Sequence, residues 1–303
     1  MTNSPSDGSV ATIGVFDGVH RGHQALLAVA RARADARGLP LVAVTFDPHP
    51  MSVVGPRVAP ASLATIEQRV ALLKAHGADD VDVVTFDEAL SRESPEQFIG
   101  QVLVGDVRAR EIVVGEDFRF GHRAAGSVTT LQEQGLDNDF AVLPVPLAGA
   151  EGQRWSSTYA RQLIEAGEVN TARGVLGRDY SLVGSVVHGD HRGRELGFPT
   201  ANLHWDGVPA IPADGVYAGW LETDGITYPA AISVGTNPHF AGTVRRVETY
   251  VLDRDDLDLY GHAITVRFVE RIRGQMAFDD LSGLIDQMTS DVDIARRALE
   301  SRD

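Results

Sequence analysis

The sequence predicts an α/β half followed by a β half, because apolar residues recur with a different period in each. Up to about residue 145, short apolar runs alternate with amphipathic helical stretches, which is typical of a doubly wound parallel sheet with crossover helices. From about residue 181, apolar residues alternate with polar ones between turn residues, which predicts an antiparallel sheet or small barrel. A helical stretch over 279–300 follows as a terminal helix. With 303 residues, of which 43% are hydrophobic, the chain can bury two medium cores.

Each apolar run of the first half is expected to form a strand, and each amphipathic stretch a helix. The expected strands are 11–16, 41–46, 81–86, 111–115 and 140–145, and the expected helices are 22–37, 64–76, 94–104 and 127–136. Residues 157–177 have a helical pattern, with Ser157 or Thr158 at the start and Gly177 at the end.

The second half contains runs with the period of two that a half-buried strand requires. These expected strands are 181–189, 215–221, 228–235, 247–253 and 263–269. We therefore expect a first domain over 1–155, a helical connection over 156–180 and a second domain over 181–303.

Composition excludes several classes of function. The chain has no cysteine, which rules out disulfides, thiolate zinc sites and a cysteine nucleophile. Its formal net charge of −15 argues against a general nucleic-acid binder, because phosphate backbones are held by an excess of Lys and Arg. Lys74 is the sole lysine, so no GxxxxGK loop exists, and phosphates must be held by Arg, His, backbone amides or a metal.

No targeting or membrane signal is evident in the sequence. The chain has no apolar run long enough to span a bilayer, and residues 1–9 lack the basic and apolar regions of a signal peptide. We therefore expect a cytoplasmic protein without a membrane partner.

A glycine-rich turn with two histidines, FDGVHRGH (16–23), joins the first expected strand to the first expected helix. The spacing of three puts His20 and His23 on one helical face, and glycines in the turn let a phosphate approach the backbone at a helix N-terminus. This pattern suits triphosphate binding. Two alternatives remain open: capping by Asp17 with surface histidines, and a metal site formed by Asp17, His20 and His23.

The stretch GVFDGVHRGH (14–23) resembles the HxGH signature of nucleotidylyltransferases, in the form found in bacterial bifunctional riboflavin kinase/FMN adenylyltransferases, also called FAD synthetases. Several transferases share HxGH alone, but further matches follow in the family's order over nearly the whole chain. They are TFDPHP (45–50), VGEDFRFGHRAAG (114–126), SSTYARQLIEAGEV (156–169), LGRDYSLVGSVVHGDHRGRELGFPTANL (176–203), GVYAGW (215–220), VGTNPHF (234–240), and VETYVLD with DLYG (247–261). The resemblance implies a nucleotidylyltransferase-type sheet followed by a riboflavin kinase-like barrel.

The resemblance implies that the first half transfers AMP from ATP to FMN, giving FAD and pyrophosphate. His20 and His23 would be the catalytic donors to the ATP phosphates, and 156–180 would complete this site. ATP-binding residues would be Gly14, Phe16, Asp17, Gly22, Ser157, Thr158 and Arg161. Flavin-binding residues would be His49, Asp117, Phe118 and Phe120, with Arg119 and Arg123 near the flavin phosphate. From the residues alone, an ordinary capped helix at 157, core phenylalanines and a structural His49 are alternatives.

The second half would be a riboflavin kinase, which transfers the terminal phosphate of ATP to the ribityl hydroxyl of riboflavin. Thr200 and Asn202 would bind Mg²⁺ through hard oxygen ligands, and Glu248 would be the base. A loop would cover the nucleotide and flavin with Gly189, Arg192, Gly193, Gly197 and Pro199. Without the resemblance, the glycine-rich loop would be interpreted as a flexible hairpin, and Glu248 as a residue on the solvent face of a strand.

The implied reactants are ATP, Mg²⁺ and the flavins riboflavin, FMN and FAD, without nucleic acid, in a monomer or weak homo-oligomer. Two positions depart from the family pattern: Tyr250 stands where histidine is expected, and His239 where threonine is usual. Three other functions remain to be distinguished: an adenylyltransferase whose second half only binds flavin, a non-catalytic flavin carrier, and a metal hydrolase built on the HxGH segment.

Overall fold

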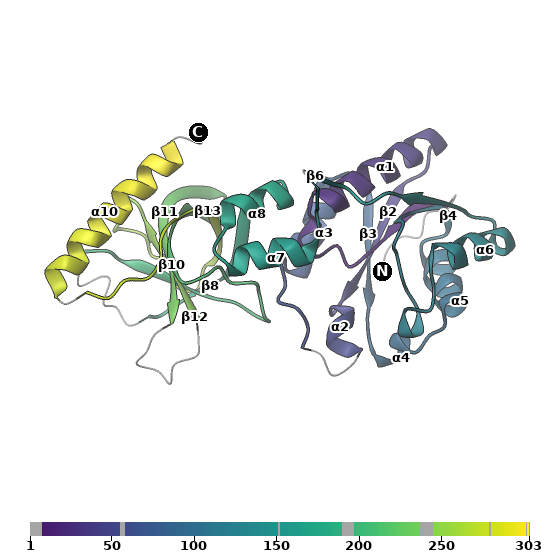
Figure 1. Cartoon of the computed structure of the whole chain (residues 1–303), viewed down its shortest axis with the longest axis horizontal. Coiled ribbons are helices and arrows are strands. Elements are labelled where there is room, and N and C mark those ends of the chain that lie inside the picture. Colours follow the sequence, from purple (N-terminus) through teal and green to yellow (C-terminus); the bar gives the residue numbers. More distant parts are fainter. Residues whose placement is uncertain are drawn as a thin grey trace. The chain divides into compact units, whose positions relative to one another are not determined.

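The computed structural model describes residues 8–54, 58–150, 152–189, 197–236, 245–278, 280–300 and 302. The chain divides into two compact units (Figure 1). The first comprises Met1–Pro60 with Thr65–Ser156, and the second comprises Ala61–Ala64 with Ser157–Asp303. The two helices that follow Ser156 therefore group with the second unit.

The first unit is built on a five-stranded parallel sheet of order β3-β2-β1-β4-β5, which confirms the predicted doubly wound fold. The strands are β1 (Ser9–Ile13), β2 (Leu41–Asp47), β3 (Asp80–Thr85), β4 (Ala109–Gly115) and β5 (Ala141–Val145), followed by a hairpin of β6 (Gly149–Ala150) and β7 (Gln153–Arg154). The order of the strands reverses at β1, so the carboxyl ends of β1 and β4 flank a crevice of the kind in which open α/β sheets bind ligands.

Helices cover both faces of this sheet. They are α1 (Arg21–Arg37), α2 (Pro50–Val53), α3 (Ile66–Ala75), α4 (Glu88–Ser91), α5 (Pro95–Phe98) and α6 (Val128–Asn138), with the π-helical η2 (Ile99–Asp106) and the 3₁₀ turns η1 (Asp17–Val19) and η3 (His122–Ala124). Alternate residues of β1 enter different cores: Val10 packs with α1 and α3, whereas Ala11 packs with η2 and α6. This alternation follows from the period of two in a strand and gives the unit two apolar layers.

The second unit contains a closed barrel of order β10-β11-β12-β9-β8-β13, as the alternating pattern predicted. Its strands are β8 (Tyr180–Val187), β9 (Thr200–His204), β10 (Gly215–Thr223), β11 (Ile226–Thr236), β12 (Arg245–Val251) and β13 (Ala263–Arg273). Strand β9 was not among the predicted strands, because prolines and glycines surround it and its apolar run is short.

The helical stretch 157–177 forms two helices, α7 (Ser157–Glu165) and α8 (Val169–Leu176), rather than one. Gly167 separates them with φ +81°, and a Cβ there would lie 2.8 Å from the hydroxyl of Tyr217. Gly177 closes α8 in the left-handed conformation, as expected for a helix C-cap.

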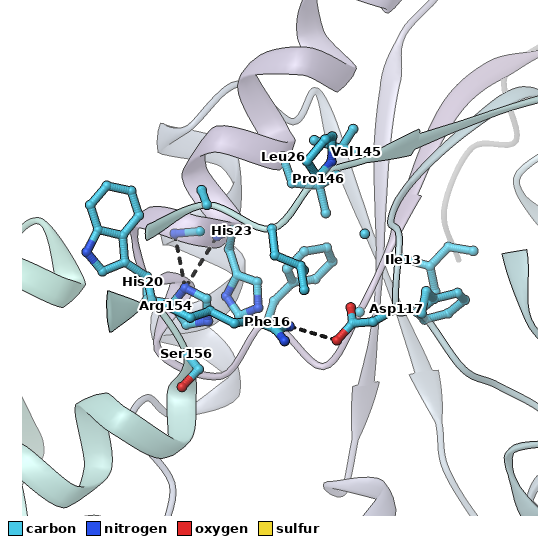
Figure 2. A pocket seen from close by; sticks show the side chains of 17 residues that line it. Ile13, Phe16, His20, His23, Leu26, Asp117, Val145, Pro146, Arg154 and Ser156 are labelled. Atoms are coloured by element: carbon cyan, nitrogen blue, oxygen red, sulfur yellow. Dashed lines mark hydrogen bonds and ion pairs between the residues drawn. The ribbon is translucent and has the colours of Figure 1, made fainter. Parts of the chain in front are cut away.

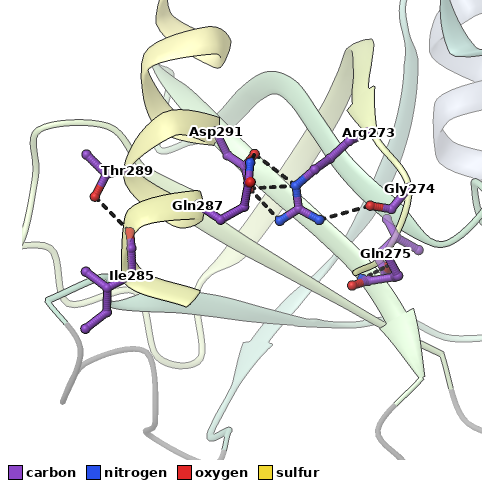
Figure 3. Close-up of polar contacts among 8 residues, drawn as sticks. Arg273, Gly274, Gln275, Ile285, Gln287, Thr289 and Asp291 are labelled. Atoms are coloured by element: carbon purple, nitrogen blue, oxygen red, sulfur yellow. Dashed lines mark hydrogen bonds and ion pairs between the residues drawn. The ribbon is translucent and has the colours of Figure 1, made fainter. Parts of the chain in front are cut away.

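The terminal helix α10 (Leu281–Glu300) lies against the outside of the barrel, where Ala295 and Leu299 pack with Ala218 of β10 and Val269 of β13. A polar contact adds direction to this apolar docking (Figure 3). Arg273 at the end of β13 donates from Nη2 to Oδ2 of Asp291 at 2.6 Å, and Asp291 is only 3% exposed. Along the described residues, no helix is both long enough and apolar enough to cross a membrane.

Candidate active sites

A cavity of about 180 Å³ lies at the carboxyl end of the parallel sheet, in the first unit (Figure 2). Its walls come from the turn after β1, the first turn of α1, the loops after β4 and β5, and the β7 end of the hairpin. Seven of the residues that line it were predicted as site residues: Gly14, Phe16, His20, Gly22, His23, Asp117 and Phe118. Residues up to about 100 positions apart in sequence thus meet at the predicted crevice.

His20 is the N-cap of α1. Its Nδ1 accepts hydrogen bonds from the backbone N–H groups of Gly22 at 3.1 Å and His23 at 3.4 Å. Because Nδ1 accepts, the neutral ring carries its proton on Nε2, which is therefore a donor. The alternative of capping by Asp17 with surface histidines does not hold for His20, which is 6% exposed and is itself the cap of the helix.

His23 stacks on His20, with ring centroids 3.7 Å apart, and its edge meets Phe16 at 5.1 Å. Its Nδ1 is buried without a hydrogen-bond partner among the described residues. Burial lowers the pKa of His23 well below its ordinary value, and His20 and Arg69 lower this pKa further. His23 is therefore neutral near pH 7 and presents uncharged ring nitrogens.

The left-handed backbone of the turn shapes the cavity floor. Phe16 has φ 51°, Gly18 φ 74° and Val19 φ 38°, and this sharp reversal brings the first turn of α1 back over the sheet. A Cβ at Gly22 would lie 3.0 Å from ring atoms of His20 and 3.3 Å from the carbonyl oxygen of Trp155. Gly22 is thus needed for close packing at the helix N-terminus.

An ion pair spans two of the cavity walls. Arg154 Nη2 of β7 lies 2.7 Å from Oδ2 of Asp117, which follows β4 (Figure 2). The neighbouring Trp155 also lines the cavity, and the guanidinium of Arg21 lies over its ring at 5.8 Å. Sequence reasoning missed Arg154 and Trp155, although they directly precede the quoted SSTYAR segment.

Four further predicted residues of this site lie elsewhere in the first unit. Phe120 is 7% exposed and packs in the core against Phe98 and Phe118, so it supports the cavity wall through Phe118 instead of lining it. His49 caps α2 by accepting from the N–H of Met51 at 3.1 Å. Arg119 and Arg123 are exposed. The flavin-binding roles of these residues stay predictions.

Ser157, Thr158 and Arg161 stand on the first turns of α7 and belong to the second unit. Nε of Arg161 donates to the carbonyl of Ala61, in the short segment that joins the same unit, at 2.6 Å. Their expected function as a second phosphate clamp stays a prediction.

The three residues predicted to act in phosphate transfer come together on the barrel. Asn202 of β9 lies directly opposite Glu248 of β12, and Thr200 lies opposite Tyr250, in an antiparallel register. Because side chains alternate along a strand, these four share one face. Ala201, Val247 and Thr249 point to the other face and are buried.

A cavity of about 420 Å³ lies beside Asn202, whereas Thr200 and Glu248 are not among its lining residues. Asn202 and Gly189 line it together with Trp205 and Arg246. A Cβ at Gly189 would lie 2.6 Å from Cγ of Asn202 and 2.7 Å from its Oδ1, so only glycine allows this approach. Gly197 has φ +84° and Pro199 precedes β9, whereas Arg192, Gly193 and the departure at His239 lie outside the described residues.

Oxygen donors suit Mg²⁺, and the shared face of β9 and β12 carries a hydroxyl, an amide and a carboxylate within three register positions. The residues present therefore fit a magnesium site formed by Thr200 and Asn202, beside Glu248. Among the described residues, no three His, Cys, Asp or Glu side chains gather as a metal site.

Comparison with known proteins agrees with this arrangement. Residues 2–159 match the family model for FAD synthetase, and residues 176–299 match the model for riboflavin kinase. A Pseudomonas fluorescens protein named bifunctional riboflavin kinase/FMN adenylyltransferase is 37% identical over 290 residues, which cover 95% of this chain and 92% of that protein. The Escherichia coli K12 protein of the same name is 36% identical over 303 residues, covering 98% and 94%.

A crystal structure from Streptococcus pneumoniae, titled macrolide-efflux protein, is 33% identical, with a TM-score of 0.87 over 98% of this chain and 95% of that one. Its title differs from the names of the family models and the sequence relatives, but its fold is the one described above. The two matched models and the near-complete coverage by relatives lead to one conclusion: this chain belongs to the family of bifunctional riboflavin kinase/FMN adenylyltransferases.

Proposed function

We propose that the first unit adenylylates FMN in the cavity at the carboxyl end of β1 and β4, and that the second unit phosphorylates riboflavin at the shared face of β9 and β12. The observation that carries this proposal is that the residues of each predicted site meet separately, one set around His20 and His23 and the other around Asn202 and Glu248. The first unit thus contains the histidines proposed for the first reaction, and the second unit contains Thr200, Asn202 and Glu248, proposed for the second.

In the first reaction, a phosphate oxygen of FMN attacks the α-phosphorus of ATP, and the bond to pyrophosphate breaks. No covalent intermediate with the protein is needed, so the task is in-line positioning and stabilisation of charge on the phosphates. Nε2 of His20 donates to a phosphate oxygen, because Nδ1 is occupied by backbone N–H groups. His23 acts as a second uncharged donor, and the N-terminus of α1 adds its positive dipole end.

Asp117 and Phe118 serve the flavin, since both line the cavity on the side of β4. Arg154 is paired with Asp117 and lies where an anionic phosphate would enter. The second phosphate clamp expected of Ser157, Thr158 and Arg161, which belong to the second unit, stays a prediction.

In the second reaction, the ribityl hydroxyl of riboflavin attacks the terminal phosphorus of ATP, the bond from that phosphorus to ADP breaks, and Glu248 accepts the hydroxyl proton. Thr200 and Asn202 would hold Mg²⁺, which when bound would neutralise charge on the phosphates. Gly189 keeps the chain close to Asn202. The loop role expected of Arg192, Gly193, Gly197 and Pro199 stays a prediction, because Arg192 and Gly193 lie outside the described residues. Because both reactions consume ATP, we assign the protein to the cytoplasm. We expect it to be a monomer or a weak homo-oligomer.

The test is incubation of the full chain with riboflavin, ATP and Mg²⁺, with FMN and FAD followed by chromatography. FMN should appear first and then convert to FAD. If supplied FMN yields FAD while riboflavin stays unchanged, the second unit only binds flavin and the roles given to Thr200, Asn202 and Glu248 are wrong.

Variants then separate the two sites. The double change His20→Ala with His23→Ala should abolish FAD formation and leave FMN formation intact, whereas Glu248→Ala should do the reverse. Loss of both activities in either variant, with its circular dichroism spectrum unchanged, would contradict the assignment of separate sites.

A further inference from the structure

Arg69 of α3 is a buried cation that none of the predicted residue sets contains. It is 4% exposed, and its Nη1 donates to the carbonyl of Phe46 at 2.9 Å and to Oγ1 of Thr45 at 3.4 Å. The hydroxyl of Thr45 donates in turn to the carbonyl of Val15 at 3.0 Å. Val15 immediately precedes the left-handed turn that ends at His20. A chain of contacts therefore runs from α3, through the end of β2, to the histidine turn.

The charge of Arg69 is poorly compensated by its hydrogen bonds. Its Nε is buried and has no hydrogen-bond partner among the described residues. Burial lowers the pKa of Arg69, and the nearby carboxylates of Asp17 and Asp47 oppose this shift. Asp17 is itself 2% exposed and belongs to the same turn. Burial of an arginine without full pairing costs stability, so a purely structural role would be served better by an apolar side chain.

The turn needs support from below. Phe16 and Val19 are non-glycine residues in the left-handed region, and Val19 is β-branched, for which this conformation is especially unfavourable. Such a backbone persists only where its surroundings hold it. The contact of Arg69 through Thr45 holds Val15, which directly precedes Phe16. The buried Asp17 of the same turn is close enough to Arg69 for their opposite charges to attract.

We propose that Arg69 is a positioning residue of the adenylyltransferase site, which holds the histidine turn from below and adds positive potential behind His20 and His23. This inference rests on the proposed function of the first unit. A cation that is already in place behind the neutral donors attracts the negatively charged triphosphate. It does not have to reorient during the reaction, so this attraction carries no reorganisation cost. The guanidinium also disfavours a charge on His23, which keeps that ring a neutral donor.

The first test compares Arg69→Met and Arg69→Lys with Arg92→Met, a matched loss of charge at an exposed arginine of the same unit. We expect kcat/KM for FAD formation to fall about 100-fold in Arg69→Met and about 10-fold in Arg69→Lys, and to stay within about twofold in Arg92→Met. FMN formation by the second unit of the same chain should not change. Unchanged FAD formation in Arg69→Met would overturn the proposal.

The second test does not depend on catalysis. In an NMR titration, with the His23 resonance assigned by its absence in His23→Gln, Arg69→Met should raise the pKa of His23 by about half a unit or more. The acid limb of the FAD-forming rate should move to higher pH by the same amount. Besides burial, His20 and Arg69 lower the pKa of His23. Asp17 and Asp47 act on Arg69, and Asp117 and Arg154 line the same cavity as His23. An unmoved His23 titration would contradict the proposal even if activity were lost.

Thr45→Val separates support of the turn from charge, because it removes the hydroxyl bridge and leaves the cation in place. We expect it to lower kcat/KM for FAD formation about 10-fold with little change in the His23 titration. If the unaltered protein makes no FAD, the proposed function fails, whereas the inference on Arg69 is still decided by the titration. If Arg69→Met does not fold, Arg69→Lys and Thr45→Val decide it.

Discussion

At the residue scale, each candidate site contains a glycine that lets the backbone lie directly against a side chain of the site. Gly22 leaves only enough room for the ring of His20, and Gly189 leaves only enough room for the amide of Asn202. The first contact fixes the ring that is proposed to donate to phosphate, and the second fixes a proposed ligand of Mg²⁺. Neither glycine is explained by backbone conformation, since neither has a positive φ.

Gly189→Ala should therefore abolish or reduce FMN formation at least about 10-fold, because the new methyl group must push the Asn202 side chain away from the shared face. FAD formation from supplied FMN should stay unchanged. Gly174→Ala is the matched control: no atom lies within 4 Å of its Cβ, and it lies inside α8. That control should raise stability by about 0.5–1 kcal/mol without affecting either activity. Normal FMN formation in Gly189→Ala would contradict the assigned role of Asn202.

Glu111 of β4 carries a buried charge far from the cavity. Its carboxylate accepts from Arg33 at 2.7 Å and also from Arg37, and the residue is 2% exposed. Burial alone would raise the pKa of Glu111, but the hydrogen bonds and charges of the two arginines outweigh it and lower this pKa. The stability that the carboxylate contributes is therefore complete above its ordinary pKa and is lost as the pH falls through the lowered one.

Glu111→Gln should reduce the free energy of unfolding of the first unit by about 2 kcal/mol at pH 7 and flatten its decline below about pH 4.5. Urea denaturation at a series of pH values measures both effects. Glu88→Gln is the control, because Glu88 is exposed and pairs with Arg92 one helical turn away. An equal decrease in the free energy of unfolding in both variants would show that burial does not make the Glu111 ion pairs more stabilising than an exposed pair.

At the scale of elements, the start of α1 combines a structural role with a proposed functional one. His20 acts as N-cap and as proposed phosphate donor at once, because its two ring nitrogens face different partners. On the barrel, the register between β9 and β12 has the same importance, since a shift by one residue would turn Glu248 to the opposite face from Asn202.

The docking of α10 rests on one buried ion pair within an apolar contact (Figure 3). Asp291→Asn should lower the stability of the second unit by about 2 kcal/mol, because Arg273 loses its charged partner where water has little access. Asp293→Asn, two residues away in a pair that is half exposed, should cost at most about 0.5 kcal/mol. Thermal unfolding measures the difference, and equal losses would refute the importance of the buried pair.

At the scale of the whole molecule, each unit has its own core and its own site. We therefore expect calorimetry of the full chain to show two unfolding transitions. Glu111→Gln should lower the midpoint of one transition, and Asp291→Asn should lower the midpoint of the other. A single transition that moves with both variants would show that the units unfold together.

The sequence by itself determined the doubly wound sheet and the barrel, because strand and helix periods are local properties. Its ordered motifs also supplied the candidate residues of both sites, whose roles stay predictions. The short strand β9 was not predicted, because the prolines and glycines around it are typical of loops. The strand is stabilised by its pairing with neighbouring strands, which the local sequence does not show. The same locality explains why Gly167 was not recognised as a break between two helices: the crowding by Tyr217 comes from another part of the chain.

Only the tertiary structure decided which side chains meet. It placed Phe120 in the core, made His20 a buried cap and brought Arg154 opposite Asp117. It also put Arg69 beneath the histidine turn. In the sequence, the burial of Arg69 is indicated only by its position four residues before Leu73, a core residue on the same helical face. Burial and electrostatic coupling arise between segments that are distant in sequence, so no local pattern contains them.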